Sequence, residues 1–173
     1  DEIYQIRLKE YERLCQPFDL GIVKSPENFA GGKHMVWVKG RGVGASFKGG
    51  SIAAYNYFFV EESNTFLTAD DKAFLDDDGL WTKTIEYVDF LNANTAFKKS
   101  RSINTKEHIQ AGFIEDEVMK GSMSQIMAIS MSDDPDKARG KDASLIIYEE
   151  AGTFSNLESS YNATRPSVEA GAY

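Results

Sequence analysis

The sequence has few of the residues that cross-link small proteins through disulfides or bound metal ions. It has one cysteine and two histidines among 173 residues, so an internal disulfide is impossible and a cysteine–histidine zinc site is excluded. No apolar run approaches the length of a membrane span. Basic residues are also scarce, since 19 Lys and Arg face 27 Asp and Glu, for a net charge of −8. That balance argues against a protein that coats nucleic acid, but not against one that touches it through a few local cations. We expect a reduced, cytoplasmic setting.

The length and composition are those of one globular domain. A chain of 173 residues can bury a sizeable core. Its 42% apolar and 27% charged residues are ordinary for such a domain. The sequence stops in mid-pattern at residues 169–173, so we expect the chain to be a fragment of a longer protein.

Segments with strand and helix patterns alternate along the chain. We expect helices at residues 2–15, 45 to about 60, 76–91 and 154–163, and short apolar strands at residues 34–38, 65–69, 110–114, 125–129 and 143–148. A turn is expected at Lys120 and Gly121. The acids at 76–78 should cap the helix that follows them, and the last helix should end before Pro166. The alternation predicts an α/β fold with a mainly parallel central sheet.

Residues 39–46, with the sequence KGRGVGAS, nearly match the phosphate-loop signature G-x-x-x-x-G-K-[ST]. The match holds at Gly44 and Ser46. Ala45 stands where the signature has its lysine, and Lys39 stands where it has its first glycine. That lysine normally supplies positive charge to the β- and γ-phosphates.

The loop retains the other features of a phosphate site. Its three glycines allow backbone N–H groups to surround an anion, and the following helix adds its positive end. Lys39 and Arg41 can supply the missing charge from the front of the loop, and Ser46 is placed to bind Mg²⁺. The expected nucleotide-binding residues are Lys39, Gly40, Arg41, Gly42, Val43, Gly44, Ala45 and Ser46. The alternative is a glycine-rich strand-to-helix turn without a ligand.

A second motif consists of four apolar residues, Leu145 to Tyr148, followed by Glu149 and Glu150. A buried strand of this kind delivers carboxylates to the carboxyl edge of the sheet, where ligands bind in open α/β folds. Successive side chains point to opposite faces, so Glu149 can face Ser46 and a metal ion while Glu150 polarises the attacking water. The alternative is a pair of solvated acids at a strand end.

Together the two motifs resemble the ATPase domain of the large terminase subunits of tailed bacteriophages. Some members of that family carry the lysine at the front of the loop, as Lys39 does, and many carry an arginine three residues before the last glycine, as Arg41 does. Residues 136–152 also resemble the family, as do Phe154-x-x-Leu157 and Arg165-Pro166. The similarity covers most of residues 34–170, but only the two nucleotide motifs are specific.

The resemblance implies a P-loop NTPase of the ASCE type, with three layers. Residues 1–173 would be its N-terminal ATPase domain, which lacks the C-terminal nuclease domain and can be inactive alone. It implies ATP and Mg²⁺, with Glu150, Lys39 and Arg41 catalytic and Ser46 and Glu149 on the metal. The whole protein would drive double-stranded viral DNA into a procapsid in the host cytoplasm. Its partners would be the portal protein, the small terminase subunit and further copies in a ring.

Other readings of the same motifs remain open. A different P-loop motor, such as a helicase, shares both nucleotide motifs, and a catalytically silent nucleotide- or anion-binding assembly module could keep the fold alone. Arg139 and Arg101 are candidates for an arginine that acts on a neighbouring subunit. Gln16 is a candidate for contact with adenine.

Overall fold

The computed structural model describes residues 36–38, 40, 42–132, 134, 136–139 and 141–170, without the side chains of residues 169 and 170. The chain divides into two compact units, Asp1–Val38 and Lys39–Tyr173. The second unit contains all the helices and strands of the described residues. The expected helix at 2–15, with Gln16 after it, lies outside the described residues, as do residues 34–35 of the first expected strand, Lys39 and Arg41.

A five-stranded sheet forms the centre of the second unit. Its strand order is β2-β3-β6-β1-β7. Strands β6, β1 and β7 run parallel to one another, whereas β3 is antiparallel to β6 and β2 is antiparallel to β3. The strands are β1 (Asn64–Ala69), β2 (Arg101–Asn104), β3 (His108–Ala111), β6 (Gln125–Ser130) and β7 (Leu145–Tyr148). The fold is therefore α/β with a mixed sheet, parallel where the candidate site lies.

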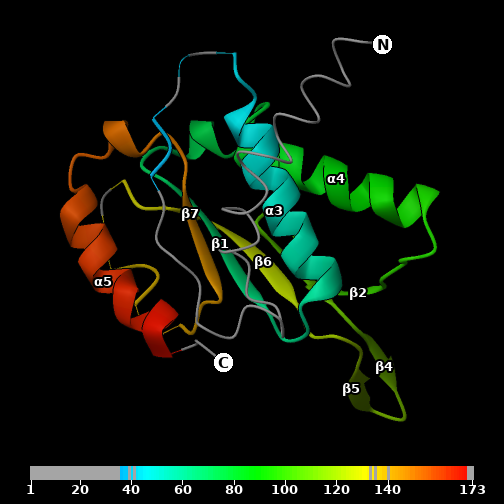
Figure 1. Cartoon of the computed structure of the whole chain (residues 1–173). Coiled ribbons are helices and arrows are strands. Elements are labelled where there is room, and N and C mark those ends of the chain that lie inside the picture. The colour runs from blue at the N-terminus through cyan, green and yellow to red at the C-terminus, as the bar shows by residue number, and fades with distance from the viewer. Residues whose placement is uncertain are drawn as a thin grey trace. The chain divides into compact units, whose positions relative to one another are not determined.

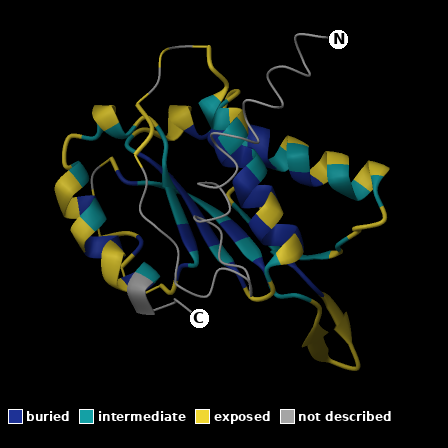
Figure 2. Cartoon of the chain, in the orientation of Figure 1, coloured by how far each residue is buried: buried dark blue, intermediate teal, exposed yellow. Residues whose placement is uncertain are grey.

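Helices cover both faces of this sheet. Helices α3 (Ala45–Phe59) and α4 (Leu80–Asn94) lie on one face and α5 (Leu157–Ala170) lies on the other (Figure 1). Because side chains alternate along a strand, β1 contributes Leu67 to the core under α3 and α4 and Phe66 to a second core on the opposite face. The buried residues concentrate in the central strands and on the helix faces toward them (Figure 2).

Two glycines let α3 and α4 approach each other closely. A Cβ added to Gly49 would lie 3.1 Å from Leu80 Cδ1, and one added to Gly50 would lie 3.2 Å from the backbone nitrogen of Thr84. The pair lowers helix propensity, yet α3 continues unbroken from Ala45 to Phe59 because packing against α4 compensates. Among the described residues, no helix has the length and apolar character needed to cross a membrane.

Three expected elements match closely. Helix α3, strand β1 and the helix that contains Trp81 and Val88 form where their periodicity predicted them. The predicted aspartate cap is wrong, because Gly79 occupies the N-cap position and no side chain caps α4. The chain instead turns through left-handed residues Asp77 and Asp78, and Asp78 pairs with Lys83.

The predicted strand at 110–114 is wrong in its extent. The chain leaves the sheet at Gly112, and a hairpin of β4 (Phe113–Glu115) and β5 (Val118–Lys120) forms a sheet of its own. Its turn lies at Asp116 and Glu117, not at Lys120 and Gly121, because both acids have positive φ angles, as a two-residue hairpin turn requires. Strand β2 was not predicted from the sequence, since its sequence RSIN has no apolar run.

The last helix is also longer than predicted, because α5 runs through Pro166 to Ala170. A proline inside a helix removes one hydrogen bond and disfavours helix before it. Tertiary contacts override this preference, since Thr164 and Ser167 are buried, Val168 packs into the second core and the Ser167 carbonyl accepts a hydrogen bond from Ala143.

The described part of the predicted strand at 34–38 is not a strand. Residues 36–38 have no regular secondary structure, and Val36 and Val38 are 86% and 98% exposed. A short apolar run becomes a strand only when a neighbour accepts its backbone hydrogen bonds. Neither sheet of the described residues includes this segment.

Candidate functional site

The start of α3 and the carboxyl end of β7 meet at one point. Ile147 lies on the α3 face of the sheet, 3.8 Å from the position of a Cβ on Gly49. Glu149, two residues further, therefore emerges on the same face. The Ser46 hydroxyl, one residue into α3, donates a hydrogen bond to Glu149 Oε1 across a sequence separation of 103 residues. This contact joins the two motifs of the sequence.

A glycine turn leads into this contact. Gly42 and Gly44 have φ angles of 77° and 76°, in the left-handed region, where glycine carries no Cβ penalty. Gly44 is the N-cap of α3, no side chain caps the helix there, and its first turn has no acid. The N–H groups of such a first turn are the donors that a helix N-terminus offers to an anion.

Glu150 follows with a strained backbone. Its φ and ψ are 46° and 49°, the left-handed helical region, which disfavours residues with a Cβ. The conformation is held by a 3-10 turn, η2 (Ala151–Thr153). Both the backbone N–H and the hydroxyl of Thr153 donate to the Glu150 carbonyl at 2.8 Å. Such strain in an otherwise ordinary loop is typical of functional sites.

Tyr148 anchors the opposite face of β7. Its hydroxyl shares a hydrogen bond with the Thr164 hydroxyl on α5, and the Phe154 ring packs edge-on against it with centroids 5.9 Å apart. Burial raises the pKa of the Tyr148 phenol, although the hydrogen bond that it shares with Thr164 opposes the rise. The strand that carries the two acids is thus fixed from both faces.

The oxygen pair of Ser46 and Glu149 fits Mg²⁺. Magnesium prefers hard oxygen ligands and is usually bound by one or two protein groups, with phosphates and water completing its octahedron. Among the residues that the structure describes, no group of three or more His, Cys, Asp or Glu could hold a metal ion by itself. The pair therefore suits a metal that arrives with a phosphorylated ligand.

Some of the other predicted site residues lie within the described part of the chain and some lie outside it. Gly40, Gly42, Val43, Gly44 and Ala45 belong to the turn before Ser46 or to the start of α3. Lys39 and Arg41 lie outside the described residues, so their roles stay predictions.

Both arginine candidates for action on a neighbouring subunit have partners within the chain. Arg101 pairs with Asp89 and is largely covered, whereas Arg139 pairs with Asp136 at 3.1 Å and is well exposed. Arg139 is therefore the more accessible of the two.

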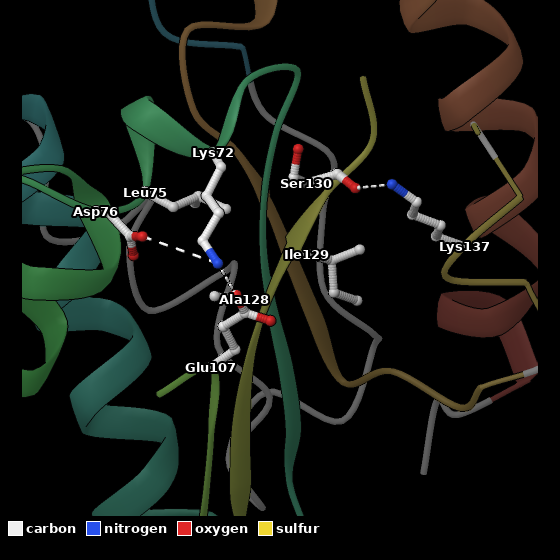
Figure 3. Close-up of a pocket in the computed structure, with 8 residues that line it drawn as sticks. All are labelled: Lys72, Leu75, Asp76, Glu107, Ala128, Ile129, Ser130 and Lys137. Carbon is white, nitrogen blue, oxygen red and sulfur yellow. Dashed lines mark hydrogen bonds and ion pairs between the residues drawn. The ribbon is translucent and has the colours of Figure 1, made fainter. Parts of the chain in front are cut away.

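A hollow of about 270 Å³ lies apart from Ser46 and Glu149, beyond the carboxyl ends of β1 and β6 (Figure 3). Lys72 pairs there with Glu107 and lies 4.0 Å from Asp76, while Lys137 Nζ donates to the Ser130 carbonyl at 2.9 Å. The two cations are balanced by two carboxylates, so the hollow does not favour a phosphate. Its lining comes from four separate segments, which is why no sequence motif indicated it.

No protein-family model matches the chain, and no curated protein matches it. The function is therefore argued from the geometry of the site and from the two motifs.

Proposed function

We propose that this chain is a P-loop NTPase that binds ATP with Mg²⁺ between the glycine turn and the end of β7 and hydrolyses it. In this proposal it is the ATPase domain of a terminase large subunit. The observation that carries the proposal is the Ser46–Glu149 hydrogen bond at the open N-terminus of α3. A loop hydroxyl and a strand-end carboxylate are the two protein groups that hold Mg²⁺ in P-loop NTPases.

Each residue then has a defined task. The first-turn N–H groups of α3 and the glycine turn bind phosphate oxygens, and Lys39 and Arg41 add positive charge. Ser46 and Glu149 hold Mg²⁺, which neutralises charge on the β- and γ-phosphates. Glu150 accepts a hydrogen bond from the attacking water and orients it in line with the γ-phosphate. A positioned acid–base group of this kind typically contributes a factor of about 100 to 10,000 in rate.

The hydrolysis test uses Glu150→Gln, which keeps the shape of the side chain and removes its charge. We expect ATP turnover by the intact protein to fall about 100-fold or more while its affinity for Mg-ATP changes little. Glu158→Gln, at an exposed position in the first turn of α5, is the matched control and should leave both unchanged. Normal turnover by the Glu150 variant would remove that residue from the mechanism.

The lysine at the front of the loop is tested separately. Lys39→Ala should weaken nucleotide binding far more than Lys48→Ala, because Lys48 lies two residues beyond Ser46 on α3 and points to another side of the helix. Equal effects would contradict the placement of the phosphate charge at the front of the loop. Absence of binding by the unaltered chain at millimolar ATP would instead favour a silent assembly module.

The motor role is supported by the resemblance of the two motifs to terminases. The proposed partners are double-stranded viral DNA, the portal protein, the small terminase subunit and further copies in a ring, all in the host cytoplasm. ATP-dependent packaging of DNA into procapsids by the intact protein is the direct assay. Strand separation without packaging would identify a helicase instead.

A further inference from the structure

The hairpin of β4 and β5 projects from the domain as an arm. We define the arm as residues 112–121; every residue of its two strands is exposed (Figure 2). Four of those six side chains are apolar: Phe113, Ile114, Val118 and Met119. An isolated two-stranded hairpin is marginally stable in water, and exposed apolar clusters mark interaction surfaces.

The arm is a specifically built element. Gly121 has a φ of +116°, and a Cβ there would lie 2.9 Å from the Gly112 Cα, so the two ends of the arm cross at a glycine pair. An ion pair between Glu115 and Lys120 spans the two strands. The tip carries Asp116 and Glu117, both exposed. The arm is thus apolar along its length and acidic at its tip.

An exposed aromatic surface, with two lysines next to it in the sequence, lies beside the base of the arm. We define the aromatic patch as Tyr55, Phe59 and Phe97, whose neighbouring rings lie 5.1 Å apart. Each is at least 39% exposed. Lys98 and Lys99 follow directly, and Glu61 is the acid near Lys99.

We propose that the arm of one copy of this chain docks on the aromatic patch of a second copy. Aromatic residues and methionine are enriched at the centres of protein interfaces, and the acidic tip complements Lys98 and Lys99. The rings of the patch are not coplanar, with 77° between Phe59 and Phe97 and 44° between Tyr55 and Phe59, so they do not form the flat platform on which bases stack. A protein occupant is therefore favoured over a nucleic acid.

The arm and the aromatic patch lie close together. The backbone N–H of Gly112 donates to the Ser100 carbonyl at 2.9 Å, so the arm begins three residues from Phe97. A second copy related by a two-fold axis places each arm on the patch of the other. This contact forms pairs and does not depend on nucleotide binding.

The first experiment measures self-association of the full chain by sedimentation. We expect dimers to appear as the protein concentration is raised to about 1 mM, because a weak specific contact has a dissociation constant in this range. Ile114→Ser with Met119→Ser, and separately Phe97→Ser, should each weaken the dimer about tenfold or more. Phe90→Ser, at an exposed phenylalanine of α4, is the control and should have no effect. A chain that stays monomeric throughout would overturn the proposal.

A charge exchange tests the pairing directly. One chain carries Asp116→Lys and Glu117→Lys, and the other carries Lys98→Glu and Lys99→Glu. Each alone places like charges at both contacts and should dimerise more weakly than the unaltered chain. Their mixture restores opposite charges at both contacts and should form the heterodimer preferentially. A mixture no better than its components, or an oligonucleotide bound by the patch while Phe97→Ser leaves self-association unchanged, would contradict the proposal.

Discussion

Glu150 combines a strained backbone conformation with a proposed catalytic role. Its left-handed conformation, with φ at 46°, costs a residue with a Cβ about 1–2 kcal/mol. The two hydrogen bonds from Thr153 hold this conformation. Strain is found at functional sites where the surrounding structure holds it in place, which agrees with the proposal that Glu150 orients a water molecule.

Glycine at this position should separate stability from function. We expect Glu150→Gly to raise the free energy of unfolding by up to about 1 kcal/mol, since glycine accepts positive φ without strain, while ATP turnover is lost. Glu150→Ala loses turnover but retains the strain, so its stability should not rise. Urea unfolding of both variants measures the difference. Equal stabilities would show that the backbone there is unstrained.

The raised pKa of Tyr148 predicts that the stability of the fold decreases at alkaline pH. Burial raises its pKa above the ordinary value of 10.0, so the folded state holds this proton more tightly than the unfolded state. The stability it contributes is complete below pH 10.0 and is lost as the pH rises through the folded pKa. Urea unfolding across this range should show a decline that is smaller in Tyr148→Phe. An identical pH slope in that variant would assign the decline to other groups.

At the scale of elements, periodicity predicted what local sequence controls. The apolar run that ends at Tyr148 forms β7, and the helical pattern after Gly44 forms α3. Both were predicted because their burial agrees with their pattern. The arm was missed because its strands are exposed on both faces, so no alternation marks them. Pro166 misled the prediction because buried contacts of α5 outweigh a local preference. The Ser46–Glu149 contact was foreseen through two motifs, whereas the hollow of Figure 3 had none.

The contact between α3 and α4 gives a prediction in which two adjacent glycines differ. Alanine in a helix is normally favoured over glycine by about 1 kcal/mol. At Gly50 the new methyl group would press on the α4 backbone at Thr84, so Gly50→Ala should destabilise the fold by about 1–3 kcal/mol. At Gly49 the neighbour is the flexible end of Leu80, so Gly49→Ala should be close to neutral. Thermal unfolding compares the two; a stabilising Gly50→Ala would show that the helices are further apart.

At the scale of the whole molecule, the candidate site ties together parts of the chain that are remote in sequence. Helix α3 begins at the glycine turn, and Glu149, 103 residues after Ser46, directly follows the end of β7. The chain segment between α3 and β7 contains helix α4 and the other four strands of the five-stranded sheet. A ligand held by both ends would bind only the folded chain, so its affinity adds to the stability of the entire unit.

This linkage gives a prediction that does not depend on turnover. Mg-ATP at 100 times its dissociation constant should raise the free energy of unfolding by about 2.7 kcal/mol. Ser46→Ala should remove most of the magnesium-dependent part, because its hydroxyl is one of the two protein oxygens proposed to hold the metal. Ser51→Ala, whose hydroxyl donates to the Lys48 carbonyl within α3, is the control and should retain the full effect. Stabilisation of Ser46→Ala equal to that of the unaltered chain would place the metal elsewhere, and loss of stabilisation in both variants would point to damage in α3 rather than to a ligand.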